Sequence, residues 1–223
     1  MKIKVCGITD LDQFNSLHEM GVSFAGFIFY PPSPRYVFKR GLQARDVKKT
    51  SSKIIKVGVF VDATYAEMVQ QIDAFGLDMV QLHGRETPYE CAKIGSYIDV
   101  IKAFRFAEND HVPWMIKDYY EGADMFLFDT GVPAPKEERE NKTLHGGTGR
   151  RFNTNRLRDL NVGKPFFISG GIEPTDAPLV KSFMQQSVAK DLFVVDINSR
   201  FEVAPGIKNM QQVKQFITEL HTP

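Results

Sequence analysis

The feature of this 223-residue chain that most constrains its fold is a regular alternation of short β-rich runs with amphipathic stretches. The β-rich runs predict eight strands, at residues 3–6, 24–29, 54–61, 79–82, 100–106, 125–129, 165–169 and 192–197. Helical periodicity predicts helices between them, at residues 10–20, 65–75, 87–97, 154–160, 176–186 and 209–220. Because parallel strands need helical crossovers, the alternation predicts a parallel sheet covered by helices.

The number of units predicts how this sheet closes. Eight units in a chain of this length are typical of a (β/α)8 TIM barrel, as a single compact domain over residues 1–223. A doubly wound open sheet is the structural alternative, but no Gly-x-Gly-x-x-Gly motif follows the first predicted strand. Polar residues just before four predicted helices should cap them: Thr64, Thr87, Asp176 and Asn209.

Composition and charge restrict the function classes. With 43% hydrophobic and 25% charged residues, the chain matches an ordinary globular protein. A formal net charge of +1 leaves no general electrostatic footprint for nucleic acid or an anionic membrane, so any anion must be held locally. No signal segment precedes the first strand, and no apolar stretch approaches the length of a membrane span. We therefore expect a cytoplasmic protein.

The two cysteines stand in different contexts. They are too few for a disulfide framework, and both should be free thiols in a reducing compartment. Cys91 lies in a helical context and is expected to be a buried small hydrophobe. Cys6 ends the first apolar run, and Gly7 and a turn follow it at once. That position is poor for packing and good for chemistry, at the mouth of a strand.

Polar residues gather where the predicted strands end. In a (β/α)8 barrel the active site is built at these ends. They bring a thiol, a carboxylate, an imidazole, guanidinium groups and two loops of backbone donors to one mouth: Cys6, Arg35, Gln81, His83, Arg105, Asp129, Gly170, Gly171, Asp196, Asn198 and Ser199. The long polar segment 131–149 is of a kind that is usually functional or mobile.

Several of these residues allow two interpretations. Burial at the end of an apolar run disfavours the ionised form of a carboxyl, which suits Asp129 to act as a general acid; a cap or an ion pair is the alternative. His83 could orient a substrate or satisfy a loop carbonyl. The loops after the last two predicted strands form a possible phosphate site, with ordinary tight turns as the alternative. No spacing matches a structural zinc site or a nucleotide P-loop.

Nine short motifs follow one another along the chain. They are KVCGIT at 4–9, GFIFY at 26–30, SPRY at 33–36, VGVF at 57–60, VQLHG at 80–84, FDT at 128–130, GGTG at 146–149, SGG at 169–171 and APG at 204–206. Their combination resembles the phosphoribosylanthranilate isomerase family of tryptophan biosynthesis. The resemblance implies an Amadori rearrangement of N-(5-phosphoribosyl)anthranilate to 1-(2-carboxyphenylamino)-1-deoxyribulose 5-phosphate.

The resemblance also implies roles for the site residues. Asp129 would protonate the ribose ring oxygen, and Cys6 would then remove the C2 proton as a thiolate, which requires a lowered thiol pKa or a transient acceptor. Arg35 would hold the anthranilate carboxylate, since a guanidinium grips a carboxylate with two hydrogen bonds. Contacts to the sugar and ring would come from Gln81, His83 and Asp196. Contacts to the phosphate would come from Gly170, Gly171, Asn198 and Ser199.

No metal or organic cofactor is implied, because the iminium formed on ring opening acidifies the C2 proton. The expected partner is a small phosphoribosyl substrate, and the expected state is a monomer or at most a homodimer. Two positions depart from the family pattern: residues 152–154 read Phe-Asn-Thr in place of Phe-Asp-Trp, and Arg200 stands where glycine is common. Arg200 could contact phosphate or face solvent. The alternatives are another phosphosugar barrel enzyme or a non-catalytic phosphate-ligand-binding barrel.

Overall fold

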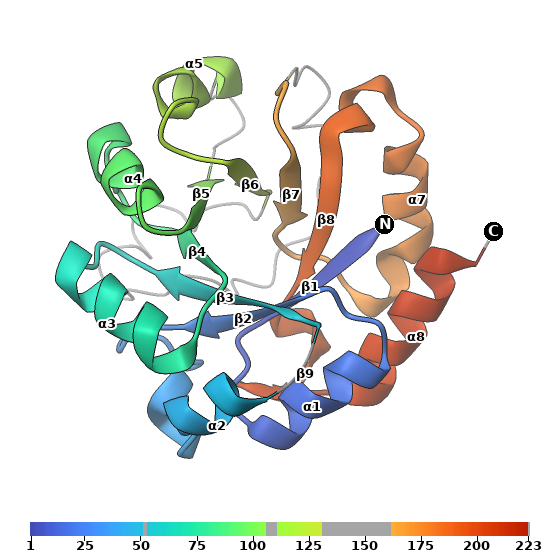
Figure 1. Cartoon of the computed structure of the whole chain (residues 1–223). Helices are drawn as coiled ribbons and strands as arrows, with labels where there is room; N and C mark the ends of the chain where they lie inside the picture. The colour runs from blue at the N-terminus through green and yellow to red at the C-terminus, as the bar shows by residue number, and fades with distance from the viewer. Residues whose placement is uncertain (51–52, 106–110, 131–161, 223) are drawn as a thin grey trace, which may run out of the picture.

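The structure is a computed structural model and describes residues 1–50, 53–105, 111–130 and 162–222. Eight parallel strands close into a barrel in chain order (Figure 1). They are β1 (Lys2–Cys6), β2 (Phe24–Ile28), β3 (Ile55–Phe60), β4 (Met79–Leu82), β5 (Asp99–Arg105), β6 (Met125–Asp129), β7 (Phe166–Ser169) and β8 (Leu192–Ile197). The predicted (β/α)8 barrel is confirmed.

Helices cover the outside of the barrel in Figure 1. They are α1 (Leu11–Glu19), α2 (Ala44–Lys49), α3 (Tyr65–Phe75), α4 (Pro88–Gly95), α5 (Val112–Ile116), α7 (Ala177–Met184) and α8 (Met210–His221). Short 3-10 turns lie at η1 (Val37–Arg40), η2 (Lys117–Tyr119), η4 (Pro174–Asp176), η5 (Ser187–Asp191) and η6 (Ser199–Phe201). The predicted helix at 154–160 and the long segment at 131–149 lie outside the described residues.

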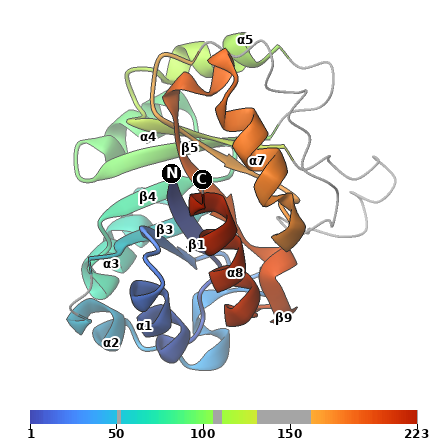
Figure 2. The same cartoon turned by 90° about the vertical axis from the view of Figure 1, so that its right-hand side faces the viewer.

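A small hairpin follows β8 and was not predicted from the sequence. Its strands are β9 (Glu202–Ala204) and β10 (Ile207–Lys208), paired antiparallel. After it, α8 returns along the barrel, so the two ends of the chain lie side by side (Figure 2). His221 Nε2 is 2.8 Å from the carbonyl oxygen of Met1.

Three of the four predicted helix caps are confirmed. Thr64 and Thr87 each form a capping box, and the Asn209 side chain accepts the backbone N–H of Gln212. The prediction for Asp176 is wrong. Its carboxylate accepts the backbone N–H of Glu173 at 2.8 Å, because a 3-10 turn, η4, precedes α7 and takes up this side chain.

The pleat of the strands determines where the site lies. Successive side chains of a strand point to opposite faces, so every second residue points into the barrel. The inner face carries a buried apolar cluster: Phe24, Val57, Met79, Ile101, Ala103, Leu127, Phe167 and Val194. The opposite face packs under the helices in a larger buried cluster that includes Phe27, Phe75 and Phe128. Apolar packing thus fills most of the barrel interior, and most polar inward residues lie towards the carboxyl ends of the described strands. The buried Lys4, midway along β1, is an exception.

Candidate active site

The inward face changes from apolar to polar at the carboxyl ends of the strands. Two residues beyond inward apolar positions, the same face presents polar side chains: Gln81, Arg105, Asp129, Ser169 and Asp196. Cys6 ends β1 at the same edge. Three of these residues are direct register neighbours, because Arg105 pairs with Asp129 and Asp129 pairs with Ser169. Pleating and barrel closure thus bring these side chains to one mouth.

On one side of the mouth, Asp129 lies between a guanidinium and an imidazole. Arg105 Nε is 3.2 Å from Asp129 Oδ2, and His83 Nε2 is 3.7 Å from the same oxygen. The Asp129 side chain is 14% exposed, which agrees with the partial desolvation expected from the sequence. A neighbouring cation stabilises an ionised carboxylate, so Arg105 opposes the effect of burial. The sequence had placed Arg105 at the mouth without giving it this function.

His83 is neutral at physiological pH. Burial lowers its pKa to about 4, with the charge of Arg105 acting in the same direction and Asp129 opposing it. Gln81 Nε2 lies 3.0 Å from His83 Nδ1. An amide nitrogen can only donate, so Nδ1 accepts and the ring proton resides on Nε2, the atom that faces Asp129. Gln81 therefore contacts His83, which in turn lies beside Asp129.

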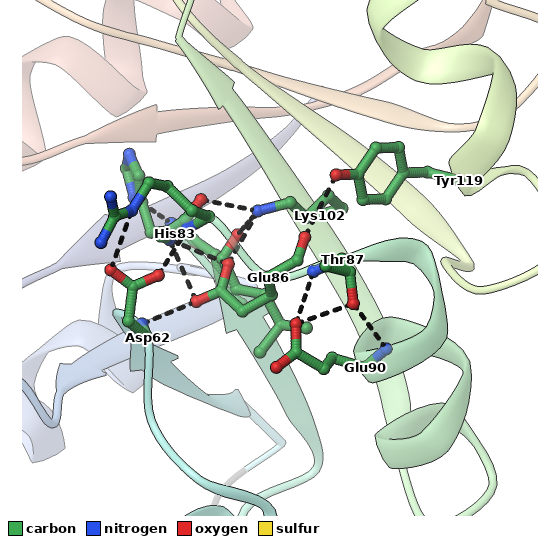
Figure 3. Close-up of polar contacts among 11 residues, drawn as sticks. Asp62, His83, Glu86, Thr87, Glu90, Lys102 and Tyr119 are labelled. Atoms are coloured by element: carbon green, nitrogen blue, oxygen red, sulfur yellow. Dashed lines mark hydrogen bonds and ion pairs between the residues drawn. The ribbon is translucent and has the colours of Figure 1, made fainter.

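The segment that follows β4 and carries His83 is anchored by a buried ion pair (Figure 3). Lys102 Nζ lies 2.8 Å from Glu86 Oε2 and donates to the carbonyl of Gly84 at 2.9 Å. Glu86 in turn accepts the backbone N–H groups of Asp62 and Gly84. Both charged side chains are at most 4% exposed. The pair lies on the outward face of the strands, so it holds the segment in place without entering the mouth.

On the other side of the mouth, Cys6 is buried with a raised pKa. Burial is the main cause, while the charges of Lys4 and Lys208 act to lower the pKa and Asp196 adds to the rise. Gly26 is the register neighbour of Cys6 on β2, and a Cβ there would lie only 2.8 Å from the thiol sulfur. Glycine at this position leaves room for the thiol. The thiol pKa of Cys6 is thus raised and not lowered.

Lys4 and Asp196 form an ion pair inside the barrel. Lys4 Nζ is 2.9 Å from Asp196 Oδ2, and the two side chains are 0% and 4% exposed. Burial disfavours the charge of Lys4, but Asp196 and Cys6 raise its pKa above the usual lysine value, so it remains an ammonium. The second oxygen, Asp196 Oδ1, is buried without a hydrogen bond to any described residue. That oxygen can accept a hydrogen bond from a hydroxyl group.

Arg35 is held by a carboxylate that the sequence analysis missed. Glu202 receives hydrogen bonds from Arg35 Nε at 2.9 Å and from Nη2 at 2.7 Å. Lys208 Nζ also lies 2.6 Å from Glu202 Oε1 and 2.8 Å from Asn198 Oδ1. The hairpin β9–β10 brings Glu202 and Lys208 to this place. Glu202 occupies the Nε edge of the guanidinium, and Nη1 forms no hydrogen bond with any described residue.

The predicted phosphate residues follow neighbouring strands, β7 and β8. Gly170 and Gly171 adopt φ values of +97° and +70°, which side chains rarely tolerate. Ser199 begins η6, and Asn198 uses its side-chain oxygen for Lys208, so any phosphate contact from Asn198 would use its N–H groups. Arg200 forms an ion pair with Glu173: its Nη2 lies 3.3 Å from Glu173 Oε1, and its side chain is 35% exposed.

The described residues contain neither a candidate metal cluster nor a membrane-spanning helix. Within residues 1–50, 53–105, 111–130 and 162–222, no group of three or more His, Cys, Asp or Glu side chains is placed to hold a metal ion. In the same part of the chain, no helix is both long and apolar enough to cross a membrane.

Comparison with known families decides what this barrel is. Residues 3–219 match the family model described as N-(5'-phosphoribosyl)anthranilate (PRA) isomerase. The chain belongs to the phosphoribosylanthranilate isomerase family. It therefore acts as an isomerase of tryptophan biosynthesis, as the motif resemblance implied.

Individual phosphoribosylanthranilate isomerases agree in sequence and in fold. The protein of that name from Parabacteroides distasonis is 34% identical over 100% of this chain and 95% of its own length. The crystal structure of the isomerase from Thermotoga maritima superposes with a TM-score of 0.78 at 28% identity, covering 99% of this chain and 98% of that one. A third related structure was solved with reduced 1-(o-carboxyphenylamino)-1-deoxyribulose 5-phosphate; its TM-score is 0.71 at 26% identity, covering 99% and 98%.

Sequence reasoning missed three charged residues of this isomerase site: Lys4, Glu202 and Lys208. A signal existed for Lys4, since it lies two residues before Cys6 and must share its face of the strand. Glu202 and Lys208 gave no such signal, because the hairpin that carries them is only a few residues long.

Proposed function

We propose that Asp129 and Cys6 are the general acid and the general base of the isomerisation. The observation that carries this proposal is their shared geometry. Cys6 is the last residue of β1 and Asp129 is the last residue of β6, so both side chains lie at the same mouth of the barrel, on strands that are not neighbours. The ligand that a related structure holds contains an anthranilate group, an opened sugar and a phosphate. A substrate of that kind needs an acid near the ring oxygen and a base near C2.

The chemistry then runs in two steps. In its protonated form, Asp129 donates a proton to the ribose ring oxygen, the C1–O bond breaks, and the anilino nitrogen lone pair forms an iminium. The Cys6 thiolate then takes the proton from C2, and the electron pair of that C–H bond moves towards the iminium nitrogen. The resulting enol amine tautomerises to the keto product. Each step is proton transfer by a positioned side chain, so these residues need no cofactor for it.

Two anion sites would hold the ends of the substrate. Arg35 would bind the anthranilate carboxylate through the guanidinium edge that Glu202 leaves open. Asp196 Oδ1, which is buried without a described partner, would accept a ribose hydroxyl. Gln81 and His83 would act beside Asp129. The phosphate would lie against the exits of β7 and β8, contacted by Gly170, Gly171, Asn198 and Ser199. Binding both ends orients the sugar between acid and base.

Variants of the two proposed residues test this assignment. In a fluorescence assay that follows loss of phosphoribosylanthranilate made in situ, Cys6→Ser and Asp129→Asn should each lower turnover about 100-fold to 10,000-fold. The Michaelis constant should change far less, because neither change removes an anion site. Matched controls are Cys91→Ala, a buried thiol on α4, and Asp124→Asn, an exposed carboxylate at the other end of the β6 region.

Near wild-type turnover of Cys6→Ser would show that another group is the base. Inactivity of the folded wild-type protein would favour a non-catalytic phosphate-binding barrel. A cytoplasmic location and a monomeric or homodimeric state complete the proposal; a related isomerase from Thermotoga maritima is described as dimeric. Sedimentation analysis of the purified chain would distinguish the two assembly states.

A further inference from the structure

We propose that Lys4 is a positioning residue that stabilises the thiolate form of Cys6. Asp196 limits this stabilisation. The inference rests on the proposed function, in which Cys6 acts as the base. It assigns a task to a buried ion pair that neither the motifs nor the acid–base assignment explains.

The backbone aims Lys4 at the thiol. Lys4 and Cys6 are two residues apart on β1, so their side chains share the inward face of the barrel. The Lys4 side chain is fully buried, and its ammonium donates a hydrogen bond to Asp196 Oδ2 at 2.9 Å. A fully buried lysine is costly to a fold unless it is paired. Here Asp196 is the paired carboxylate, and the charge of Lys4 acts on the thiol that shares its face of β1.

The charges around Cys6 come from several elements. On β8 lies Asp196, on the hairpin lie Lys208 and its partner Glu202, and after β2 lies Arg35. Strand β2 itself presents only Gly26 to the sulfur. Asp129, on β6, acts on Asp196. Of this set, Lys4 is the cation with the strongest effect on the thiol.

Lys4 and Asp196 act on Cys6 in opposite directions. A cation beside a thiol favours the thiolate, whereas a carboxylate disfavours it. Burial raises the pKa of Cys6, and Lys4 opposes that rise while Asp196 adds to it. When the thiolate removes the C2 proton, Cys6 becomes a neutral thiol and Lys4 keeps its own proton. Because only the thiolate can accept the C2 proton, a tenfold change in the thiolate fraction changes the fraction of enzyme with an active base tenfold.

Alkylation of Cys6 across a pH series measures the thiolate directly. The full-length protein is treated with iodoacetamide at pH values from 6 to 11, and modification of the Cys6 peptide is followed by mass spectrometry. Lys4→Met should move the midpoint upward by about one to three pH units, and Asp196→Asn should move it downward. Lys102→Met, which breaks a buried lysine pair on the outward face of the strands, should leave the Cys6 midpoint unchanged.

Opposite shifts distinguish a charge effect from loosened packing, which would move both variants the same way. If Lys4→Met does not fold, the double variant Lys4→Met/Asp196→Asn is compared with Asp196→Asn alone, and its midpoint should be higher. An unchanged or lowered midpoint on loss of Lys4, or parallel shifts in the two single variants, would overturn the inference. Retained turnover in Cys6→Ser would instead overturn the assignment of the base, whatever the alkylation shows.

Discussion

The two sides of the mouth hold their charges in different ways. Around Cys6, the ion pairs Lys4–Asp196 and Lys208–Glu202 are at most 4% exposed, with distances of 2.9 and 2.6 Å. At Asp129 the partner is Arg105, which is 31% exposed and 3.2 Å away. The first side is buried with its charges in ion pairs, whereas the second is partly exposed.

This difference gives the proposed base and the proposed acid different electrostatic surroundings. Charges in a water-poor interior interact strongly and are little affected by salt, so the field at Cys6 is set when the barrel closes. Near a partly exposed group, water and a bound ligand compete with the ion pair, so the environment of Asp129 can change when substrate enters. Three measurements would test this contrast.

The largest effect is expected at Glu202. Replacing Glu202 with alanine leaves Arg35 and Lys208 as buried cations without their carboxylate, and breaking a buried pair in this way costs about 3 to 5 kcal/mol. Urea unfolding would show this loss in the free energy of unfolding. The exposed Glu121 provides a matched control, since Glu121→Ala should unfold like the wild type. A loss of less than about 1 kcal/mol would mean that this side is not a closed charge network.

A smaller loss of folding stability is expected when the pH is lowered through the range in which His83 takes up a proton. The pKa of His83 is lowered from 6.5 to about 4 in the folded protein, so between these pH values the unfolded chain binds a proton that the folded one does not. Stability from this source is complete above pH 6.5 and is lost as the pH falls to about 4, a total of about 3 kcal/mol.

His83→Gln should lack this part of the acid destabilisation, as urea unfolding at pH 7 and pH 4.5 would reveal. The exposed His18 serves as the control, because His18→Gln should follow the wild-type pH dependence. Parallel pH curves for the wild type and His83→Gln would show that His83 is not kept neutral by burial.

The smallest effect is expected on the open side. Arg105→Gln should lower the free energy of unfolding by about 1 kcal/mol or less, because a partly exposed ion pair contributes little and salt screens it. Arg85, 94% exposed and 3.6 Å from Asp62, offers a control in which Arg85→Ala changes nothing measurable. The Arg105 effect should shrink in 0.5 M NaCl, while that of Glu202→Ala persists. A loss at Arg105 equal to that at Glu202 would erase the contrast between the two sides.

Strong local patterns were predictable from the chain. Strands at 79–82, 125–129 and 192–197 and the helix at 65–75 have the same bounds in sequence prediction and structure. The elements that were missed are short: α2 buries only Val47, α5 spans five residues, and the hairpin strands β9 and β10 have three and two. Such segments contain too few periodic positions to be recognised. Asp176 was misassigned because a 3-10 turn and an α-helix begin with similar residues.

Local alternation and motif order were enough to specify the barrel, the family and the strand ends at which Cys6 and Asp129 lie, since each depends on residues near in sequence. The pairing of charges around them was decided by the closed fold. Lys4 and Asp196 are 192 residues apart, and Arg35 and Glu202 are 167 apart. The sequence around one residue does not predict its partner. Only closure of β1 against β8 brings the partners together and removes the water that would otherwise screen their charges.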